Sequence, residues 1–263
     1  MTDALIPPTK LAEPSPIGTA DWTQPGIYRH VPEADYHAAP LASHSSVRQW
    51  IRAKKLGRVG VIGSALHCLA LEGREALDAR FVTSEEDWDM RTADGKARAA
   101  EIIGDSGKDL LRQKERAQVE RMFQALGHHP TARKILDAEG ENELTVVGKF
   151  DGLKQLYRCR LDMLRKASIW DLKTTSHVNE EAWLDAEVEY GYINQAEWYS
   201  SLYAALTDRH LKFGFLCVSK REPNNVWARI VPPQLMALGR KWREDVLTLY
   251  ERYVPKELAN ATK

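Results

Sequence analysis

The sequence has few features that mark a secreted, membrane-embedded or thiolate-bound protein. A membrane-spanning helix requires about 18 uncharged apolar residues in a row, and no such run is present. The first ten residues lack the basic start and apolar stretch of a signal peptide, so we expect a cytoplasmic globular protein. The cysteines, Cys68, Cys159 and Cys217, are widely separated and form no CxxC pair. They cannot supply a four-cysteine cluster and are predicted to be reduced core thiols.

An overall charge of one sign is also missing, because 37 Lys and Arg residues balance 37 Asp and Glu residues. Composition alone therefore gives no indication of nucleic-acid binding. Locally the balance differs, since residues 48–58 contain basic side chains and no acid, and two more arginines follow in a later segment. A neutral total can hide a basic groove opposite an acidic face. The cations concerned are Arg48, Arg52, Lys54, Lys55, Arg58, Arg158 and Arg160.

Four of the prolines lie within the first 16 residues, among small and polar neighbours. Such a segment cannot bury enough apolar surface to order itself, so residues 1–22 are predicted to form a flexible tail. No internal repeat, heptad pattern, low-complexity block or long linker follows. Residues 23–263 are therefore predicted to form a single domain, for which 43% hydrophobic content is ample.

Apolar spacing and composition predict helices first, then a β-meander, then further helices and strands. This order predicts an α/β (mixed α+β) fold with a central mixed sheet flanked by helices. The predicted helices are 45–53, 61–71, most of 96–138 with breaks near 104–107 and 127–130, 180–186, 190–205 and 233–253. The predicted strands are 143–150, 156–164, 169–174, 212–218 and 226–230, with turns at 151–152 and 165–168 within the meander.

Two strands of the meander carry the polar residues that suggest chemistry. In strand 156–164, alternation places one set of side chains in the core, Tyr157, Cys159, Leu161 and Met163, and the opposite set, Arg158, Arg160 and Asp162, on a polar face. In the next strand Asp171 and Lys173 are two residues apart and share a face. If the two strands pair as a hairpin, Asp162 approaches Asp171, with Lys173 alongside.

A pair of carboxylates needs a cation or a proton between them, and oxygen ligands suit Mg²⁺ or Mn²⁺. Phosphodiester hydrolysis requires an activated water and stabilisation of charge on the phosphate oxygens. Metal ions supply both, and a lysine can position the water or the developing charge. The D-x-K pattern by itself also fits a solvated ion pair on an exposed strand.

The spacing of these residues resembles the PD-(D/E)XK motif, with eight residues between Asp162 and Asp171-Leu172-Lys173, and Leu161 in place of the proline. Further segments resemble the RecE-type exonucleases (exonuclease VIII) and occur in that family's order. They are Gly26-Ile27-Tyr28, Leu41-Ala42-Ser43-His44-Ser45, Gly63-Ser64-Ala65-Leu66-His67, Arg91 to Lys96, Glu143, Arg160-Leu161-Asp162, Asp171-Leu172-Lys173-Thr174-Thr175 and Gly191-Tyr192 with Gln195 and Tyr199. The resemblance covers residues 23–205 and implies a restriction-endonuclease-like PD-(D/E)XK core.

The resemblance also implies roles for individual residues. His67, Asp162 and Asp171 would bind metal together with the Leu172 carbonyl, and Lys173 would serve the attacking water. Gln195 and Tyr199 would lie beside the scissile phosphate. Glu143 would be either a further ligand or the partner of Arg160. Thr174 and the seven basic residues named above are the predicted DNA contacts. Some of these residues also have an ordinary structural interpretation, because His67 and Tyr199 lie in apolar stretches that could simply be core.

By resemblance, the expected activity is Mg²⁺-dependent 5′-to-3′ digestion of linear double-stranded DNA, with Mn²⁺ as a substitute. The product would be a 3′ single strand for recombination by a single-strand annealing partner, often of phage origin. Related exonucleases form rings, so a cyclic homo-oligomer on DNA ends is expected, without membrane association. Three alternative functions differ from this expectation. A PD-(D/E)XK endonuclease or nickase and a non-catalytic DNA-binding module remain open, whereas an iron–sulfur nuclease conflicts with the cysteine count.

Overall fold

The structure is a computed structural model that describes residues 20–52, 60–104 and 106–254. Most of the predicted tail, residues 1–19, lies outside these ranges, as do Lys54, Lys55 and Arg58 of the basic stretch. Within them, no helix combines the length and the apolar character needed to cross a membrane.

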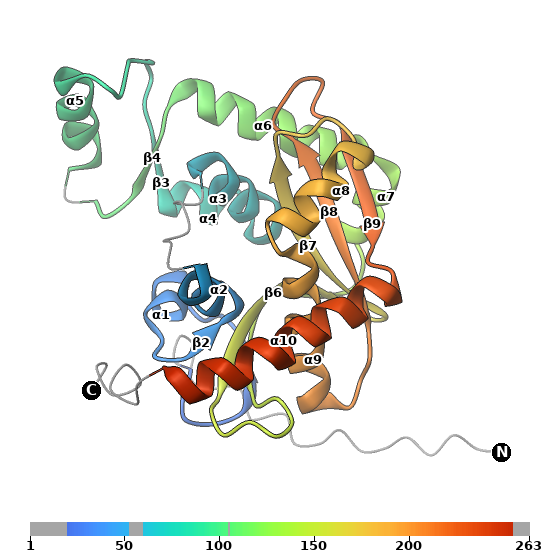
Figure 1. The fold of residues 1–263 in the computed structure, drawn as a ribbon. Helices are drawn as coiled ribbons and strands as arrows, with labels where there is room; N and C mark the ends of the chain where they lie inside the picture. Colours follow the sequence, from blue (N-terminus) through green and yellow to red (C-terminus); the bar gives the residue numbers. More distant parts are fainter. Residues whose placement is uncertain (1–19, 53–59, 105, 255–263) are drawn as a thin grey trace.

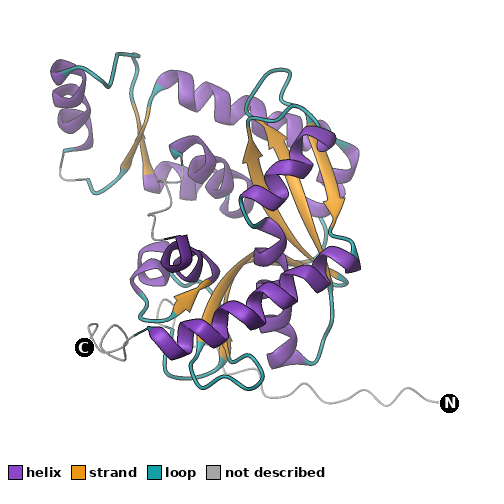
Figure 2. Ribbon diagram, viewed as in Figure 1, coloured by secondary structure: helices purple, strands orange, loops and turns teal. Residues whose placement is uncertain are grey.

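A seven-stranded mixed sheet forms the centre of the molecule (Figures 1 and 2). The strand order is β1-β5-β6-β7-β8-β9, and β2 pairs with β6. Strands β5, β6 and β7 are the predicted antiparallel meander, whereas β7 and β8 run parallel and are joined through helices. The strands are β1 (Gly26–Tyr28), β2 (Ala42–Ser43), β5 (Gly140–Gly148), β6 (Tyr157–Arg165), β7 (Ser168–Thr175), β8 (Lys212–Ser219) and β9 (Val226–Ile230).

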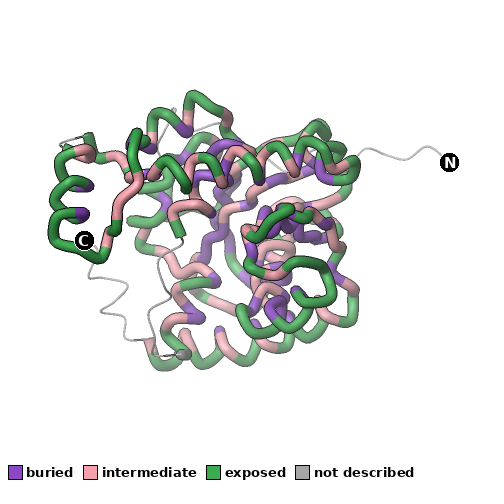
Figure 3. The backbone as a smooth tube through the Cα atoms, turned by 90° about the horizontal axis from the view of Figure 1, so that it is seen from above, coloured by how far each residue is buried: buried purple, intermediate pink, exposed green. Residues whose placement is uncertain are grey.

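Helices cover both faces of this sheet. Helices α8 (Glu180–Glu189), α9 (Tyr192–Thr207) and α10 (Pro233–Tyr253) pack on one face, where Trp183, Trp198 and Leu247 join the core residues of β6 and β8. On the other face, Leu66, Met122 and Leu216 belong to a second core. That side holds α3 (Val61–His67), the π-helix η1 (Cys68–Glu72), α6 (Gln113–His128) and α7 (Pro130–Leu136). Figure 3 shows the buried residues concentrated between these layers.

The remaining described elements lie around these layers. Helices α1 (Glu33–Ala38) and α2 (His44–Arg52) are close to β2, and α4 (Arg74–Arg80) follows η1. Strands β3 (Phe81–Thr83) and β4 (Asp109–Leu111) form a separate parallel pair, which carries α5 (Ala93–Ile103) away from the sheet (Figure 1). Of these elements, α4, β3 and β4 add Leu77, Phe81 and Leu111 to the second core. The predicted mixed sheet flanked by helices is confirmed.

Sequence periodicity was reliable for the long elements and failed for the short ones. The meander and the final helix are confirmed, but β4 lies in a stretch predicted to be largely helical, and β1 to β3 were not predicted. Two or three residues give no periodic signal, and the partner of β4 lies well before it in the chain. Helix α9 begins at Tyr192 rather than at residue 190 because Gly191 adopts left-handed backbone angles, φ 70° and ψ 30°.

The four residues of β6 that were predicted to lie in the core are confirmed as buried, but they do not all pack on the same face of the sheet, and Arg158 of the predicted polar face is buried as well. Tyr157, Cys159, Leu161 and Met163 are all inaccessible to solvent. The first three pack against the α9 side, whereas Met163 joins the opposite core together with Trp170, its pairing partner on β7. The three cysteines are buried free thiols, as predicted.

Leu161→Ala should lower the free energy of unfolding by about 2–5 kcal/mol, because it empties a site at 0% exposure in the first core. Urea denaturation monitored by tryptophan fluorescence measures this change. Leu238→Ala on α10 is the matched control, since Leu238 is 62% exposed and its truncation should have little effect. Similar losses in both variants would contradict the assignment of Leu161 to the core.

Candidate active site

The sheet opens between β6 and β7, and the polar residues of the meander gather at this opening. The two strands pair at Met163 with Trp170, Leu164 with Ile169 and Arg165 with Ser168, and the described pairing stops there. At the start of β6, Tyr157 and Arg158 pair with the short strand β2, on the edge of β6 that faces away from β5.

Asp162 lies where the two strands part. Its carboxylate accepts a hydrogen bond of 2.8 Å from the Leu172 amide, so a side chain takes the place of the next backbone carbonyl in the ladder. The predicted approach of Asp162 to the Asp171-Leu172-Lys173 strand is confirmed.

Three side chains meet at this point: His67, Glu143 and Asp162. One potential ligand atom from each lies within 4.8 Å of the other two. His67 is the last residue of α3, and its Nδ1 is 3.5 Å from Asp162 Oδ2. The π-helix η1 starts directly after His67, and π-helical turns occur frequently at functional sites.

Glu143 faces this group through an unusual backbone conformation. It lies between the paired residues Asn142 and Leu144 of β5 and has a φ of 55°. A left-handed conformation costs a non-glycine residue about 1–2 kcal/mol. Its carboxylate accepts a hydrogen bond of 2.5 Å from Arg160 Nε. Glu143 therefore holds Arg160, one of the two roles that the sequence left open, and it also lies beside His67 and Asp162; metal binding by Glu143 stays a prediction.

Asp171 and Lys173 form a second group next to the first. Lys173 Nζ is 2.5 Å from Asp171 Oδ2, and Gln195 Nε2 donates a hydrogen bond of 2.9 Å to Asp171 Oδ1. The ammonium also lies 4.9 Å from the centre of the Tyr192 ring. In this arrangement the Asp171 carboxylate is engaged by Lys173 and Gln195 and lies outside the group of His67, Glu143 and Asp162; its binding of metal together with His67 and Asp162 stays a prediction.

Burial and mutual repulsion decide the protonation of the carboxyl groups. Burial, together with the charge on Asp162, raises the pKa of Glu143 to about 7. Burial and the charge on Asp171 raise the pKa of Asp162 well above its usual range. Burial opposes the charge on Lys173, but Asp171, Tyr192 and Asp162 outweigh it, so the pKa of Lys173 is raised and the ammonium stays charged. Burial lowers the pKa of His67, which favours the neutral imidazole that can bind a metal.

The donor set fits a divalent cation. Arg160 balances Glu143 and Lys173 balances Asp171, but among the described residues no lysine or arginine lies within ion-pair distance of Asp162. A buried carboxylate without a counter-ion is costly unless it is protonated or coordinates a metal. Two carboxylates and one imidazole suit Mg²⁺ or Mn²⁺.

Other predicted site residues lie around these two groups. Tyr199 is partly buried on α9 and its ring contacts Phe213, 6.2 Å away between centroids. Burial raises the pKa of Tyr199 well above its usual range, and Asp171 and Asp162 add to the effect, which places the phenol in their electrostatic surroundings. Thr174 is half-buried on β7, one residue after Lys173.

The predicted DNA-binding arginines have structural partners. Arg158 is 6% exposed, donates from Nε to the Leu41 carbonyl and lies over the Tyr36 ring. Arg160 donates to Glu143 and to the Val31 carbonyl. Arg48 is also buried and donates to the Glu189 carbonyl. Arg52 ends α2, and Lys54, Lys55 and Arg58 lie outside the described residues. Contact of these residues with DNA stays a prediction.

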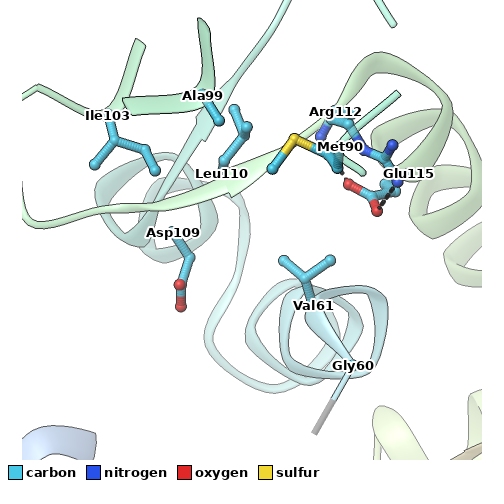
Figure 4. A pocket seen from close by; sticks show the side chains of 9 residues that line it. All are labelled: Gly60, Val61, Met90, Ala99, Ile103, Asp109, Leu110, Arg112 and Glu115. Carbon is cyan, nitrogen blue, oxygen red and sulfur yellow. Dashed lines mark hydrogen bonds and ion pairs between the residues drawn. The ribbon is translucent and has the colours of Figure 1, made fainter. Parts of the chain in front are cut away.

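Tyr192 lies next to Lys173, and the sequence predicted no role for it. Tyr192 stacks on Trp183 with ring centroids 4.9 Å apart and planes 10° from parallel, and its ring faces Lys173. The adjacent Gly191-Tyr192 pair was the only sequence signal for it. A cavity of about 390 Å³ lies elsewhere, between α3, α5, β4 and α6, and its lining shares no residue with the site (Figure 4).

Comparisons with known proteins agree with this geometry. A sequence model of the family described as a PDDEXK-like domain of unknown function (DUF3799) matches residues 42–257. A crystal structure from Eubacterium rectale, described as a "putative exonuclease", superposes with a TM-score of 0.56 at 16% sequence identity. The alignment covers 82% of this chain and 73% of that chain, and at this identity it concerns the fold alone. Together with the observed topology, these matches fit a restriction-endonuclease-like fold. No curated protein sequence matches the chain.

Asp162→Asn should weaken Mg²⁺ binding at least about 10-fold, because it removes the carboxylate shared by His67 and the Leu172 amide. Isothermal titration calorimetry measures the affinity. Asp151→Asn in the exposed turn between β5 and β6 is the matched control and should bind Mg²⁺ like the wild type. Unchanged affinity in Asp162→Asn would place the metal elsewhere.

Mg²⁺ binding should release protons near neutral pH, because the raised pKa values of Glu143 and Asp162 keep these carboxyls protonated until a cation displaces the protons. Unfolded carboxyl groups ionise near pH 4. The site therefore stabilises the metal-free fold at low pH, and this contribution is lost as the pH rises through about 7. Mg²⁺ should accordingly raise the melting temperature more at about pH 8 than at about pH 5.5. Equal binding heats in buffers of different ionisation enthalpy would contradict proton release.

Proposed function

The chain belongs to the DUF3799 family of PDDEXK-like domains, and from this premise we propose that it is a divalent-metal-dependent nuclease that digests linear double-stranded DNA from its ends. The observation that carries the proposal is the meeting of His67, Glu143 and Asp162 beside the Asp171–Lys173 ion pair. A bound cation and a fixed positive charge next to it are two means of activating water and stabilising charge in phosphodiester hydrolysis.

In this proposal each group has a defined task. His67, Glu143 and Asp162 would hold the ion, which when bound would activate water and offset charge on the phosphate oxygens. Lys173 keeps its charge and is held between Asp171 and the Tyr192 ring, where its ammonium can orient the attacking water and stabilise the developing negative charge. Gln195 fixes the Asp171 carboxylate from the opposite side.

The finer features rest on the resemblance to RecE-type exonucleases. They are 5′-to-3′ polarity, Mg²⁺ as the ion, a 3′ single-stranded product for an annealing recombinase, and a ring of subunits around the DNA. The ordered segments from Gly26 to Tyr199 support them. The description of the E. rectale protein as an exonuclease agrees with end-directed cleavage.

The proposal is tested by incubating 5′-labelled or 3′-labelled linear duplex, and a covalently closed circle, with the protein in Mg²⁺ or EDTA. Metal-dependent loss from the 5′ end with an intact circle is expected. A nicked or cut circle would identify an endonuclease instead, and DNA binding without cleavage would identify a binding module. Loss from the 3′ end would reverse the proposed polarity and leave the exonuclease assignment standing.

Lys173→Ala should reduce cleavage by about 100-fold or more while Mg²⁺ affinity is retained, because the ammonium contributes charge to the reaction and is not a ligand. Single-turnover digestion and calorimetry measure the two effects separately. Lys166→Ala in the exposed turn between β6 and β7 is the matched control. Wild-type cleavage by the Lys173 variant would overturn its assigned role.

A further inference from the structure

A series of aromatic rings connects the reactive lysine to the protein surface. Lys173 lies over the Tyr192 ring, and the Tyr190 ring follows at 5.8 Å between centroids, tilted by 52°. Trp183, which is buried, stacks on Tyr192 from the core. Tyr190 is 45% exposed, so the last ring of the series reaches solvent. Only the Tyr192 ring separates it from Lys173.

The backbone that carries Tyr190 is held in place from several directions. The Tyr190 amide donates to the Ala186 carbonyl, and the Gly191 amide donates to the Val188 carbonyl. Arg48 donates to the Glu189 carbonyl and packs against Gly191, where any Cβ would lie 3.1 Å from its Nε. The backbone of Tyr190 is therefore fixed at the junction of α8 and α9, which holds its exposed ring in a defined place on the surface.

The charge of the surroundings limits what this ring can contact. Helix α8 contains no lysine or arginine, and Glu181, Asp185 and Glu189 are exposed along it. A phosphate backbone lying along this helix would be repelled. Leu184 and Val188 of α8 are also exposed, so this helix presents apolar as well as acidic side chains to solvent. The part of a nucleic acid that can contact such an acidic and apolar surface is the uncharged, flat nucleobase.

We propose that Tyr190 is a stacking platform for an unpaired nucleobase next to the scissile phosphodiester, so that the substrate is engaged as a duplex end with its terminal pair opened. This inference rests on the proposed nuclease function and adds a residue that selects the form of the DNA end. Stacking of a base on an aromatic side chain contributes about 1–3 kcal/mol, and every base has a face that can stack, so the platform is independent of sequence.

The test compares single-turnover digestion of a blunt linear duplex with that of the same duplex carrying a stable abasic analogue at the terminal nucleotides of the digested strand. Tyr190→Ala should lower kcat/KM on the normal duplex by between about 5-fold and 150-fold. On the abasic duplex it should cause no further loss, because no base remains to stack. Tyr190→Phe should retain wild-type rates. Tyr253→Ala, at another exposed tyrosine at the end of α10, is the matched control.

Equal losses on both substrates, or none on either, would overturn the platform while leaving the nuclease assignment intact. A separate binding measurement uses 2-aminopurine at the terminal position and the Lys173→Ala protein, so it needs no cleavage. Quenching that depends on Tyr190 would support stacking, and identical quenching after Tyr190→Ala would exclude it. If wild-type protein cleaves neither duplex, the proposed function fails and the fluorescence result alone decides the platform.

Discussion

A hydrogen bond from the Leu172 amide to the Asp162 carboxylate joins β6 and β7 at the point where their backbones separate. Because a side chain serves as the acceptor there, the sheet can open without leaving a buried amide unpaired. The opening turns the neighbouring polar side chains of the two strands toward a common space. His67 reaches this space from α3 and Glu143 reaches it from β5, and both depend on Asp162 being held at the opening.

The charged side chains at the opening are held by hydrogen bonds and ion pairs with the surrounding residues. Arg160 is fixed by the Val31 carbonyl and pairs with Glu143, while Asp171 is fixed by Gln195 and pairs with Lys173. These contacts come from separate segments of the chain. Glu143 and Asp171 are thereby each matched by a cation, whereas no lysine or arginine of the described residues lies within ion-pair distance of Asp162, whose protonation is favoured when no cation is present. The same surroundings that raise carboxyl pKa values favour binding of a divalent ion.

The aromatic residues of α8 and α9 link the core to Lys173. Trp183 and Trp198 are both almost completely buried. Trp183 supports Tyr192, which in turn faces Lys173, so packing on one side of the sheet fixes a charge at its opening. Burial of large rings and the positioning of the Lys173 ammonium therefore depend on the same packing.

The sequence by itself determined the strands of the meander, the shared face of Asp171 and Lys173, and the pairing that brings Asp162 beside them, because alternation and short turns are local properties. Only the tertiary structure decided that Arg158 is buried and Arg160 partly buried with structural partners, that Glu143 takes a left-handed conformation, and that β3 pairs with β4. Each of these depends on a residue far away in the chain, such as Leu41 for Arg158. Sequence spacing carries no information about such contacts, because they arise only when the sheet and its covering helices pack together.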